Sequence, residues 1–592
     1  EFDLLILPSQ KHGFKDEHLA YFRKKRWNYF VEHLLGAEPI WEFDVDGKAE
    51  PTDEVILQGL ISDYENKPES LKETTWSNLD STFIKRKIFW LNNLNDRLNN
   101  VDLEKLTDQN RINKDLLSLV IGDQLFNLEF NSHQFPLDSE GGFIAGTVYT
   151  ALAAPKNTDK EHKQYIDLIK ALPNYFNQRI RTMREGQKAG KSSPKLIVNK
   201  SLELIDLFLA TQIEECFYMQ GVEESRKPEI YNLINNTVHP AYKKMQTFLK
   251  EEYLEAAPEQ PGIAEISEGR SYYEQRVRYF TTIDISPEEV FETGMAEVKR
   301  IRAEMDAIIA QLGFEGDYAD FLKFLREDEQ FYAKSGGELL QYAAWITKRM
   351  EGQLPKYFGK LPRMPLTVTP VPGSLAPNYT AGRYSPGSYS QNRAGEYWVN
   401  TTKLKSRPLY VLPALTLHEG VPGHHTQIML AAEIEGLPDF RKNTYLSSYG
   451  EGWALYAEFL GKEAGIYTTP YEDFGRLTYE MWRACRLVVD PGMHYMGWSR
   501  EKAFDFMATN TALSLHEVGT EIDRYIGWPG QAVSYKMGEL KIKELRAYSE
   551  EKLGDNFDIR EFHDVILMNG SIPMETLQWV IEVYIENKLK KP

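Results

Sequence analysis

Residues His418–His425 read HEGVPGHH, and residues Tyr449–Glu458 read YGEGWALYAE. A catalytic zinc takes three protein ligands from His nitrogens and carboxylate oxygens and keeps a fourth position open for water. The bound water ionises near neutral pH, and a carboxylate beside it transfers protons. Both segments are rich in these residue types. They therefore predict a metal centre carried on helices, around which the rest of the chain has to fold.

The spacing of the first segment departs from the common HExxH motif. In that motif the second His lies four positions after the first, one helical turn along the same face. Here that position is Pro422, which cannot bind a metal. His425 lies seven positions after His418, which is roughly 10 Å along a regular helix and too far for one ion. Because Pro422 and Gly423 permit a kink or a bulge, we predict a deformed helix at this point.

Two histidines compete for the role of second ligand. His425 is favoured because residues 425–427 continue the helix in the phase expected after a ligand. His424 would bind instead if the inserted loop were two residues long rather than three. Both stay candidates. Glu419, directly after His418, is the predicted general base and acid, because the Glu of such a motif faces the bound water.

A separate segment supplies the third ligand. Glu451-Gly452-Trp453-Ala454 reads as a helix that begins near Gly450. This helix resembles the NEGFA-type helix of the aminopeptidase N type, in which the Glu before the Gly is the third zinc ligand. The resemblance assigns that role to Glu451, so the predicted ligands are His418, His425 or His424, and Glu451, with zinc as the cofactor.

Further motifs extend the resemblance to most of the chain. They are RACRLVVD at 483–490, His494 followed by Gly497-Trp498-Ser499, and PGQA at 529–532 followed by Ser534-Tyr535-Lys536. Together with the two metal segments they resemble the family called domain of unknown function 885, which is similar to the gluzincin metallopeptidases. The likeness runs from about Gly141 to Phe562 and is most specific between Asn400 and Gly538. It implies a mainly α, zincin-like metallopeptidase fold, with long helices in two lobes around a cleft and a small β-sheet near the metal.

A peptidase also stabilises the negative oxygen that forms when the scissile carbonyl becomes tetrahedral. The candidates are Tyr535, His494 and Tyr525. Tyr535 comes first because it follows a Pro-Gly break and begins a new helix, where its side chain can face a cleft. Arg524 is a candidate anchor for a substrate carboxylate through paired hydrogen bonds.

One segment predicts a way to hold a peptide. Residues 395–402 read GEYWVNTT, alternate in polarity and are rich in β-forming residues, so we expect a strand. An extended peptide could pair along the edge of that strand. The run before it, residues 372–393, is dense in Pro, Gly, Ser and Asn and predicts a long loop at the rim of the cleft.

The scaffold is predicted to be helical and divided. A chain of 592 residues exceeds what one simple core supports. A breaker cluster at 256–262 suggests an N-terminal helical lobe over 1–260 and a catalytic lobe over 261–592. Among the helices, Ser286-Pro287-Glu288-Glu289 is a start signal in which Ser286 caps and Glu289 completes the capping box.

Composition limits the partners. The net charge of −18 disfavours nucleic acid, and no stretch approaches the roughly twenty apolar residues of a membrane span. Cys216 and Cys485 lie in apolar surroundings and are expected to be buried free thiols. The chain starts at Glu1 without Met, and we expect that processing or trimming removed what came before, with an extracytoplasmic location, periplasmic or lipid-anchored. Oligomeric state is left open.

Three functions fit these observations. The first is a zinc peptidase acting on peptides, and the second is a zinc amidase acting on a small non-peptide amide. The third is a binding protein with a degenerate metal site. Glu419 favours catalysis, because a closed structural site does not need a carboxylate beside an open coordination position.

Overall fold

The computed structural model describes residues 21–29, 51–73, 76–373, 376 and 379–590. By its own contacts the chain forms two compact units. The first contains residues 1–73 and 85–121, and the second contains residues 74–84 and 122–592. The boundary predicted at residue 260 falls inside the second unit, and a division into lobes at that point stays a prediction.

The first unit is helical wherever it is described in regular structure. Its elements are a helical segment at 21–29, α2 (Asp53–Glu65), most of α3 (Ser81–Asn99) and the first part of α4 (Asp108–Glu129). Apolar side chains such as Leu57 and Leu60 of α2 and Leu91 of α3 are fully buried. These helices therefore pack through an apolar stripe, as amphipathic helices do.

The second unit holds most of the chain and all three described strands. Its helices after α4 are α5 (Phe143–Ala153), α6 (Asp159–Lys188), α7 (Lys195–Ala210), α8 (Lys227–Leu233), α9 (His239–Phe248), α10 (Gly269–Thr281), α11 (Pro287–Gln311), α12 (Tyr318–Glu327), α13 (Gly336–Glu351), α14 (Leu354–Tyr357), α15 (Leu412–Glu419), α16 (His424–Ala432), α17 (Asp439–Asn443), α18 (Ser447–Glu463), α19 (Pro470–His494), α20 (Arg500–Asn510), α21 (Leu515–Gly527), α22 (Ser534–Leu553), α23 (Ile559–Leu567) and α24 (Met574–Lys590). The strands are β1 (Leu366–Pro370), β2 (Gly382–Ser385) and β3 (Gly395–Val399).

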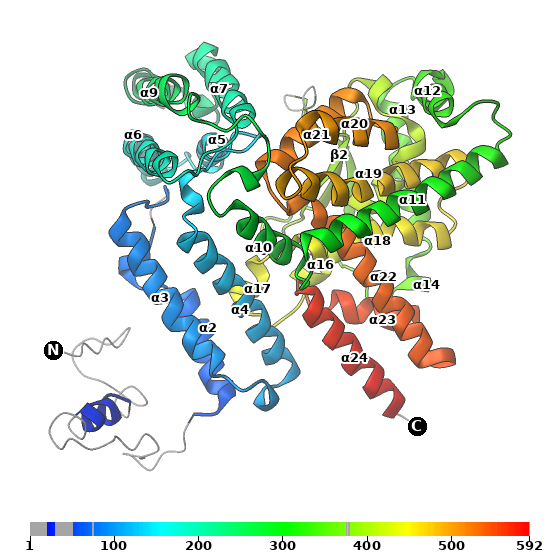
Figure 1. Ribbon diagram of the computed structural model, residues 1–592, viewed down its shortest axis with the longest axis horizontal. Helices are drawn as coiled ribbons and strands as arrows, with labels where there is room; N and C mark the ends of the chain where they lie inside the picture. The colour runs from blue at the N-terminus through cyan, green and yellow to red at the C-terminus, as the bar shows by residue number, and fades with distance from the viewer. Residues whose placement is uncertain (1–20, 30–50, 74–75, 374–375, 377–378, 591–592) are drawn as a thin grey trace. The chain divides into compact units, whose positions relative to one another are not determined.

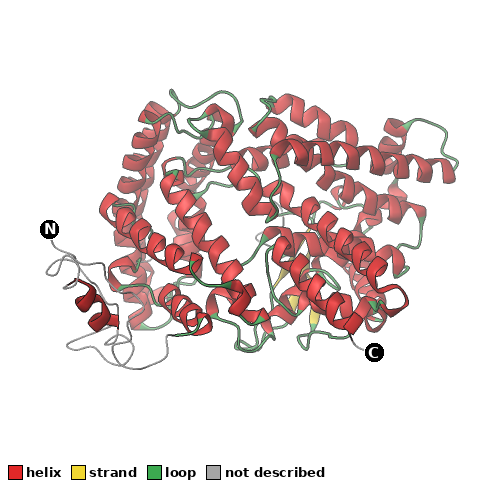
Figure 2. Cartoon of the chain, turned by 60° about the horizontal axis from the view of Figure 1, so that its bottom comes forward, coloured by secondary structure: helices red, strands yellow, loops and turns green. Residues whose placement is uncertain are grey.

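The predicted class, mainly α with a small sheet, is confirmed (Figures 1 and 2). The capping box is confirmed too: the Ser286 hydroxyl accepts from the Glu289 amide, and the Glu289 carboxylate accepts from the Ser286 amide. Both cysteines are buried and free. None of the helices in the described part of the chain is long and apolar enough to cross a membrane.

The small sheet corrects one prediction. Its order is β1-β3-β2, with β1 parallel and β2 antiparallel to β3. The strand predicted over 395–402 exists as β3, but it is the central strand, so neither of its edges is open to a peptide. The edge strands are β1 and β2, and β2 lies within the run predicted to be loop. Its four residues are too few for the alternating pattern to mark them as a strand.

Helices α18 and α22 pack closely because each carries a glycine at the crossing. A Cβ on Gly452 would lie 2.6 Å from the Gly538 Cα, and a Cβ on Gly538 would lie 2.0 Å from the Ser448 carbonyl oxygen. Any larger residue would push the helices apart. This close approach fixes the first turns of α18, where Glu451 is located.

Candidate metal centre

The HEGVPGHH segment forms two helices joined by a tight turn rather than one bulged helix. Helix α15 ends at Glu419 and α16 begins at His424. In the turn, the Gly423 amide donates to the Leu417 carbonyl at 3.0 Å, and a Cβ on Gly423 would lie 2.0 Å from the His418 carbonyl oxygen. Only glycine fits this position. The Trp453 indole of α18 donates to the Pro422 carbonyl at 2.8 Å, which ties the turn to the next helix.

Three side chains from three helices converge. The Nε2 atoms of His418 and His424 each lie 3.4 Å from Oε2 of Glu451. The two imidazole rings are perpendicular, with centroids 4.8 Å apart. One candidate ligand atom from each residue lies within 4.8 Å of the others. Tetrahedral zinc bonds of about 2.0–2.2 Å separate neighbouring ligand atoms by roughly 3.3–3.6 Å, and the two distances from the imidazoles to Glu451 match this spacing.

The structure brings His424, and not the preferred His425, to the candidate metal group. His425 is buried with both ring nitrogens engaged elsewhere: Nδ1 lies 3.0 Å from the Tyr384 hydroxyl, and Nε2 lies 3.0 Å from the Met364 carbonyl oxygen. Burial lowers the pKa of His425 to about 4, so the ring stays neutral. The prediction assumed a helix continuing in phase through Pro422. The chain instead turns and restarts, which brings His424, the first residue of α16, to the metal group.

A carboxylate lies within hydrogen-bond distance of Nδ1 of His418, the ring nitrogen that faces away from Glu451. Nδ1 of His418 lies 2.8 Å from Oε1 of Glu458, two turns after Glu451 on α18, and Nη2 of Arg483 lies 3.7 Å from the same oxygen. Metal-binding histidines commonly donate their second N–H to such a carboxylate. Burial alone would lower the pKa of His418, but hydrogen bonds to Glu451 and Glu458 raise it to about 9.

The charge of Glu451 is stabilised by the same contacts. Burial would raise the pKa of this carboxyl, but His424 and His418 lower it well below its usual range. The Tyr445 hydroxyl also donates to Oε1 of Glu451 at 3.3 Å. An ionised carboxylate beside two imidazoles is a donor set suited to a divalent cation.

Glu419 lies beside the group and is oriented from the sheet. Its Oε2 accepts from the Tyr384 backbone amide of β2 at 2.7 Å. The side chain is half-buried. Tyr384 thus contacts two residues of the motif, since its amide donates to Glu419 and its hydroxyl lies 3.0 Å from Nδ1 of His425.

Tyr535 lies near the group and Arg524 lies behind it. Burial and the charge of Glu451 raise the pKa of Tyr535, whose ring stacks under the Arg486 guanidinium with Cζ 4.3 Å from the ring centroid. Arg524 donates to Glu521 at 3.0 Å and to Gln531 at 2.9 Å. Each of the three guanidinium nitrogens of Arg524 therefore already donates one hydrogen bond to Glu521 or Gln531.

His494 is placed as a structural residue. Its Nδ1 accepts from the Ile263 amide at 3.1 Å, and its Nε2 donates to the Tyr525 carbonyl at 2.9 Å. The ring is fully buried, and burial lowers its pKa to about 4. The Tyr525 hydroxyl is engaged as well, donating to Glu521 and accepting from Arg486, both at 2.8 Å. Neither side chain has a polar atom left for a substrate.

Sequence reasoning missed three residues at the centre: Glu458, Tyr384 and Tyr445. A signal for Glu458 was present, because a carboxylate seven positions after Glu451 returns to the same helix face. Tyr384 and Tyr445 lie in a short edge strand and in a turn before α18, where no periodic pattern marks them.

Comparison with known proteins extends over nearly the whole chain. The model of a bacterial protein family of unknown function, DUF885, matches residues 59–581. A crystal structure named "putative lipoprotein from Colwellia psychrerythraea" superposes with a TM-score of 0.79 at 26% identity, covering 90% of this chain and 96% of that one. A second, named a "putative lipoprotein of unknown function from Shewanella oneidensis", has a TM-score of 0.71 at 17% identity and covers 90% and 100%. No curated protein matches the chain.

Proposed function

The chain belongs to the DUF885 family of bacterial proteins of unknown function, and we propose that it is a zinc-dependent hydrolase, specifically a metallopeptidase. The observation that carries the proposal is the convergence of His418, His424 and Glu451 within 4.8 Å, with Glu419 next to the first of them in the chain. Two imidazoles and one carboxylate, with a second carboxylate beside them, match the donor set of catalytic zinc.

When bound, zinc supplies a Lewis acid and a water that ionises near neutral pH. The residues of this chain supply the rest. Glu419 takes a proton from the attacking water and passes it to the leaving amine, and the Tyr384 amide holds its carboxylate in place. Glu458 keeps His418 in the tautomer that presents Nε2 to the ion.

Tyr535 is the proposed donor to the developing oxyanion. Burial and the charge of Glu451 raise its pKa, so the phenol keeps its proton at neutral pH. A donor positioned beforehand stabilises the negative oxygen without reorganisation during the reaction. The half-exposed Tyr445, whose hydroxyl already contacts Glu451, is the second candidate for this role.

A peptide substrate is supported by the edge of the sheet. The Tyr384 amide binds Glu419 rather than β3, so it faces the side of β2 away from the sheet. An extended peptide added along this edge would run directly past Glu419. We further propose an extracytoplasmic location, which the lipoprotein names of the two similar structures support.

Zinc analysis tests the centre. Purified protein is expected to hold about one zinc per chain, and His424→Ala is expected to lose it, because a three-ligand site rarely retains the ion on two. His425→Gln and the control His516→Ala, at an exposed position on α21, should keep it. Zinc lost from His425→Gln but kept by His424→Ala would reverse the assignment.

Turnover tests the chemistry. Glu419→Gln is expected to keep zinc and to cleave a peptide library at least 10²-fold more slowly, because the amide cannot accept the proton. Mass spectrometry of the digested library measures the rate and reports the cleavage sites. Wild-type turnover by a zinc-loaded Glu419→Gln protein would exclude the role given to Glu419.

A further inference from the structure

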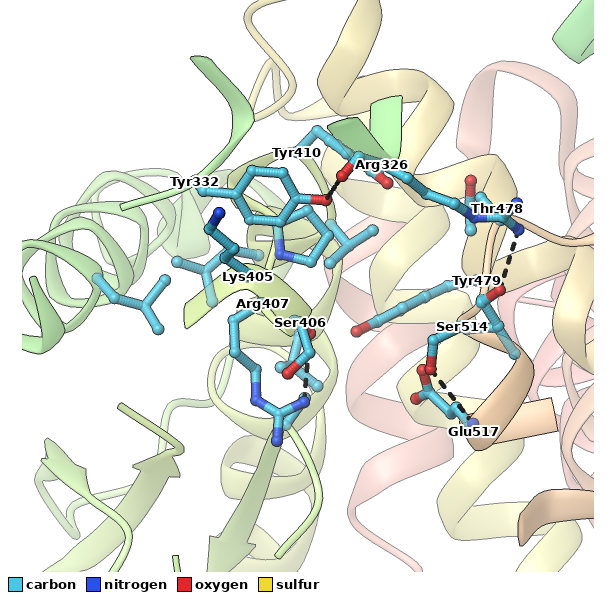
Figure 3. A pocket seen from close by; sticks show the side chains of 18 of the residues that line it. Arg326, Tyr332, Lys405, Ser406, Arg407, Tyr410, Thr478, Tyr479, Ser514 and Glu517 are labelled. Atoms are coloured by element: carbon cyan, nitrogen blue, oxygen red, sulfur yellow. Dashed lines mark hydrogen bonds between the residues drawn. The ribbon is translucent and has the colours of Figure 1, made fainter. Parts of the chain in front are cut away.

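A cavity lies at the N-terminal end of α15, the helix whose C-terminal end carries His418. Its volume is about 240 Å³. Figure 3 shows the side chains that line it, with Tyr479 reaching into the space between Arg407 on one side and Ser514 and Glu517 on the other. Most of its remaining wall is apolar, including Leu339, Val399, Leu412, Leu415 and Leu513. The volume suits one amino-acid residue rather than a larger ligand.

The polar part of the lining is positively charged. Arg326, Lys405 and Arg407 line the cavity, and none of them forms an ion pair within the described part of the chain. Arg407 donates only to backbone carbonyls, at 3.2 and 3.3 Å, and its Nε is buried with no hydrogen-bond partner among the described residues. Arg326 likewise donates to the carbonyls of residues 511 and 513. Carbonyl oxygens leave the full charge of each guanidinium uncompensated.

One carboxylate opposes these three cations. Glu517 lines the same cavity, and burial with the neighbouring charge of Glu521 raises its pKa to about 6, against the lowering effect of Arg407 and Arg483. Arg407 is half-buried, whereas Arg326 and Lys405 are exposed. These cations attract an anion most strongly where apolar walls exclude water.

The cavity is placed where a peptide on β2 would reach it. Ala381, immediately before β2, lines the cavity, and Tyr384, which binds Glu419, follows three residues later, about 10 Å along a strand. Along α15, Leu412 lines the cavity and His418 lies six residues on, about 9 Å along a helix. Measured along β2 or along α15, the distance from the cavity to the candidate metal group equals the length of about three extended residues.

We propose that this cavity binds a carboxylate of the peptide substrate, about three residues from the bond that is cut. The carboxylate comes either from an acidic side chain or from the C-terminus of the peptide. Arg407 and Lys405 bind it, and Leu412 and Leu415 pack against the rest of that residue. The inference rests on the proposed peptidase function and adds a substrate preference to it.

The test measures binding to the Glu419→Gln protein, which is not expected to cleave its ligand. Isothermal titration uses capped alanine pentapeptides in which one Glu or one Gln is moved through the positions, together with an uncapped all-alanine peptide with a free C-terminus. One Glu position, or the free C-terminus, is expected to bind about tenfold more tightly than its neutral counterpart. A Glu preference identifies the side chain, and a free-acid preference identifies the C-terminus.

Matched variants locate the preference. Lys405→Gln and Arg407→Gln are each expected to reduce it to threefold or less, while Lys403→Gln, an exposed lysine two residues away that does not line the cavity, keeps it. Equal binding of charged and neutral peptides, or a preference that survives both Lys405→Gln and Arg407→Gln, overturns the proposal. Zinc content and turnover are measured separately, so a preference without zinc rejects the peptidase alone, and turnover without a preference rejects the cavity alone.

Discussion

Two buried groups of charged side chains border helix α18 and its partner α22, and they balance their charge in opposite ways. In the lysine cluster, Lys536 of α22 is completely buried, with its Nζ 2.6 Å from Glu539, 2.8 Å from Glu480 and 3.1 Å from Glu297. In the candidate metal centre, Nε2 of His418 and Nε2 of His424 each lie 3.4 Å from the Glu451 carboxylate, and no lysine or arginine of the described residues pairs with that carboxylate.

Under the proposed function, this difference in charge balance separates a structural cluster from a cation-binding site. The lysine cluster is complete, because its carboxylates surround a cation that the chain itself provides, and that cation and its neighbours lower the pKa of Glu480 well below its usual range although burial opposes this. Under the proposed function the metal group takes its cation from outside the chain, and without that ion a proton on His418 balances part of the charge of Glu451. Buried charge alone therefore does not distinguish the two groups; they differ in whether the chain provides a lysine or arginine partner.

The largest effect is expected when the lysine cluster loses its cation. Lys536→Met removes a completely buried cation from the buried Glu480 and Glu539 and the half-buried Glu297. Glu480 keeps Arg476 and Glu539 keeps Lys543, so the loss of unfolding free energy is expected to be at most the roughly 3–5 kcal/mol of a broken buried ion pair. Urea denaturation followed by circular dichroism measures it. The folded fraction should still bind zinc at the wild-type ratio, because the cluster does not share a ligand with the metal group.

Lys541→Met is the matched control for this change. Lys541 lies on the same helix and pairs with the exposed Glu544 at 2.8 Å, a contact of the kind that contributes about 0–1 kcal/mol. Equal destabilisation by the two variants would show that the burial of Lys536 has no special cost, and the contrast between the two groups would fail.

A smaller effect, on metal affinity, is expected from changing Glu458, which contacts His418 and is not itself a predicted ligand. Glu458→Gln keeps the size of the side chain and an oxygen for His418 Nδ1 but removes the charge, and changes of this kind weaken metal affinity by about 10–100-fold. Competition with a zinc chelator measures the affinity. Glu463→Gln, on the same helix but paired with Arg546, should leave it unchanged. An unaltered affinity in Glu458→Gln would mean that the carboxylate only packs.

The sequence was sufficient to locate the two segments of the candidate metal group, but it was insufficient to predict how their side chains are arranged. Residue types and spacing predicted helices around His418 and Glu451, because ligand chemistry and helix periodicity are local properties. The choice between His424 and His425 depends on where the chain restarts its helix after Pro422, which is set by contacts with Trp453 and β2. The surroundings of the oxyanion candidate His494 could not be predicted for a similar reason, since its partners Ile263 and Tyr525 are brought to it only by tertiary packing.

The smallest expected effect is the release of a proton from His418 when zinc binds. The pKa of His418 is raised from about 6.5 when unfolded to about 9 when folded without metal, so this group adds stability that is complete below pH 6.5 and is lost as the pH rises through 9. A metal ligand must be neutral imidazole, so zinc binding near pH 7.5 should release about one proton from His418. Isothermal titration in buffers of different ionisation enthalpy counts the protons. The count should fall toward zero near pH 10, whereas the lysine cluster contributes nothing across this range, because its cation stays charged. A count that does not depend on pH would mean that His418 is already neutral before zinc binds. The charge of Glu451 would then not be balanced by a proton on His418.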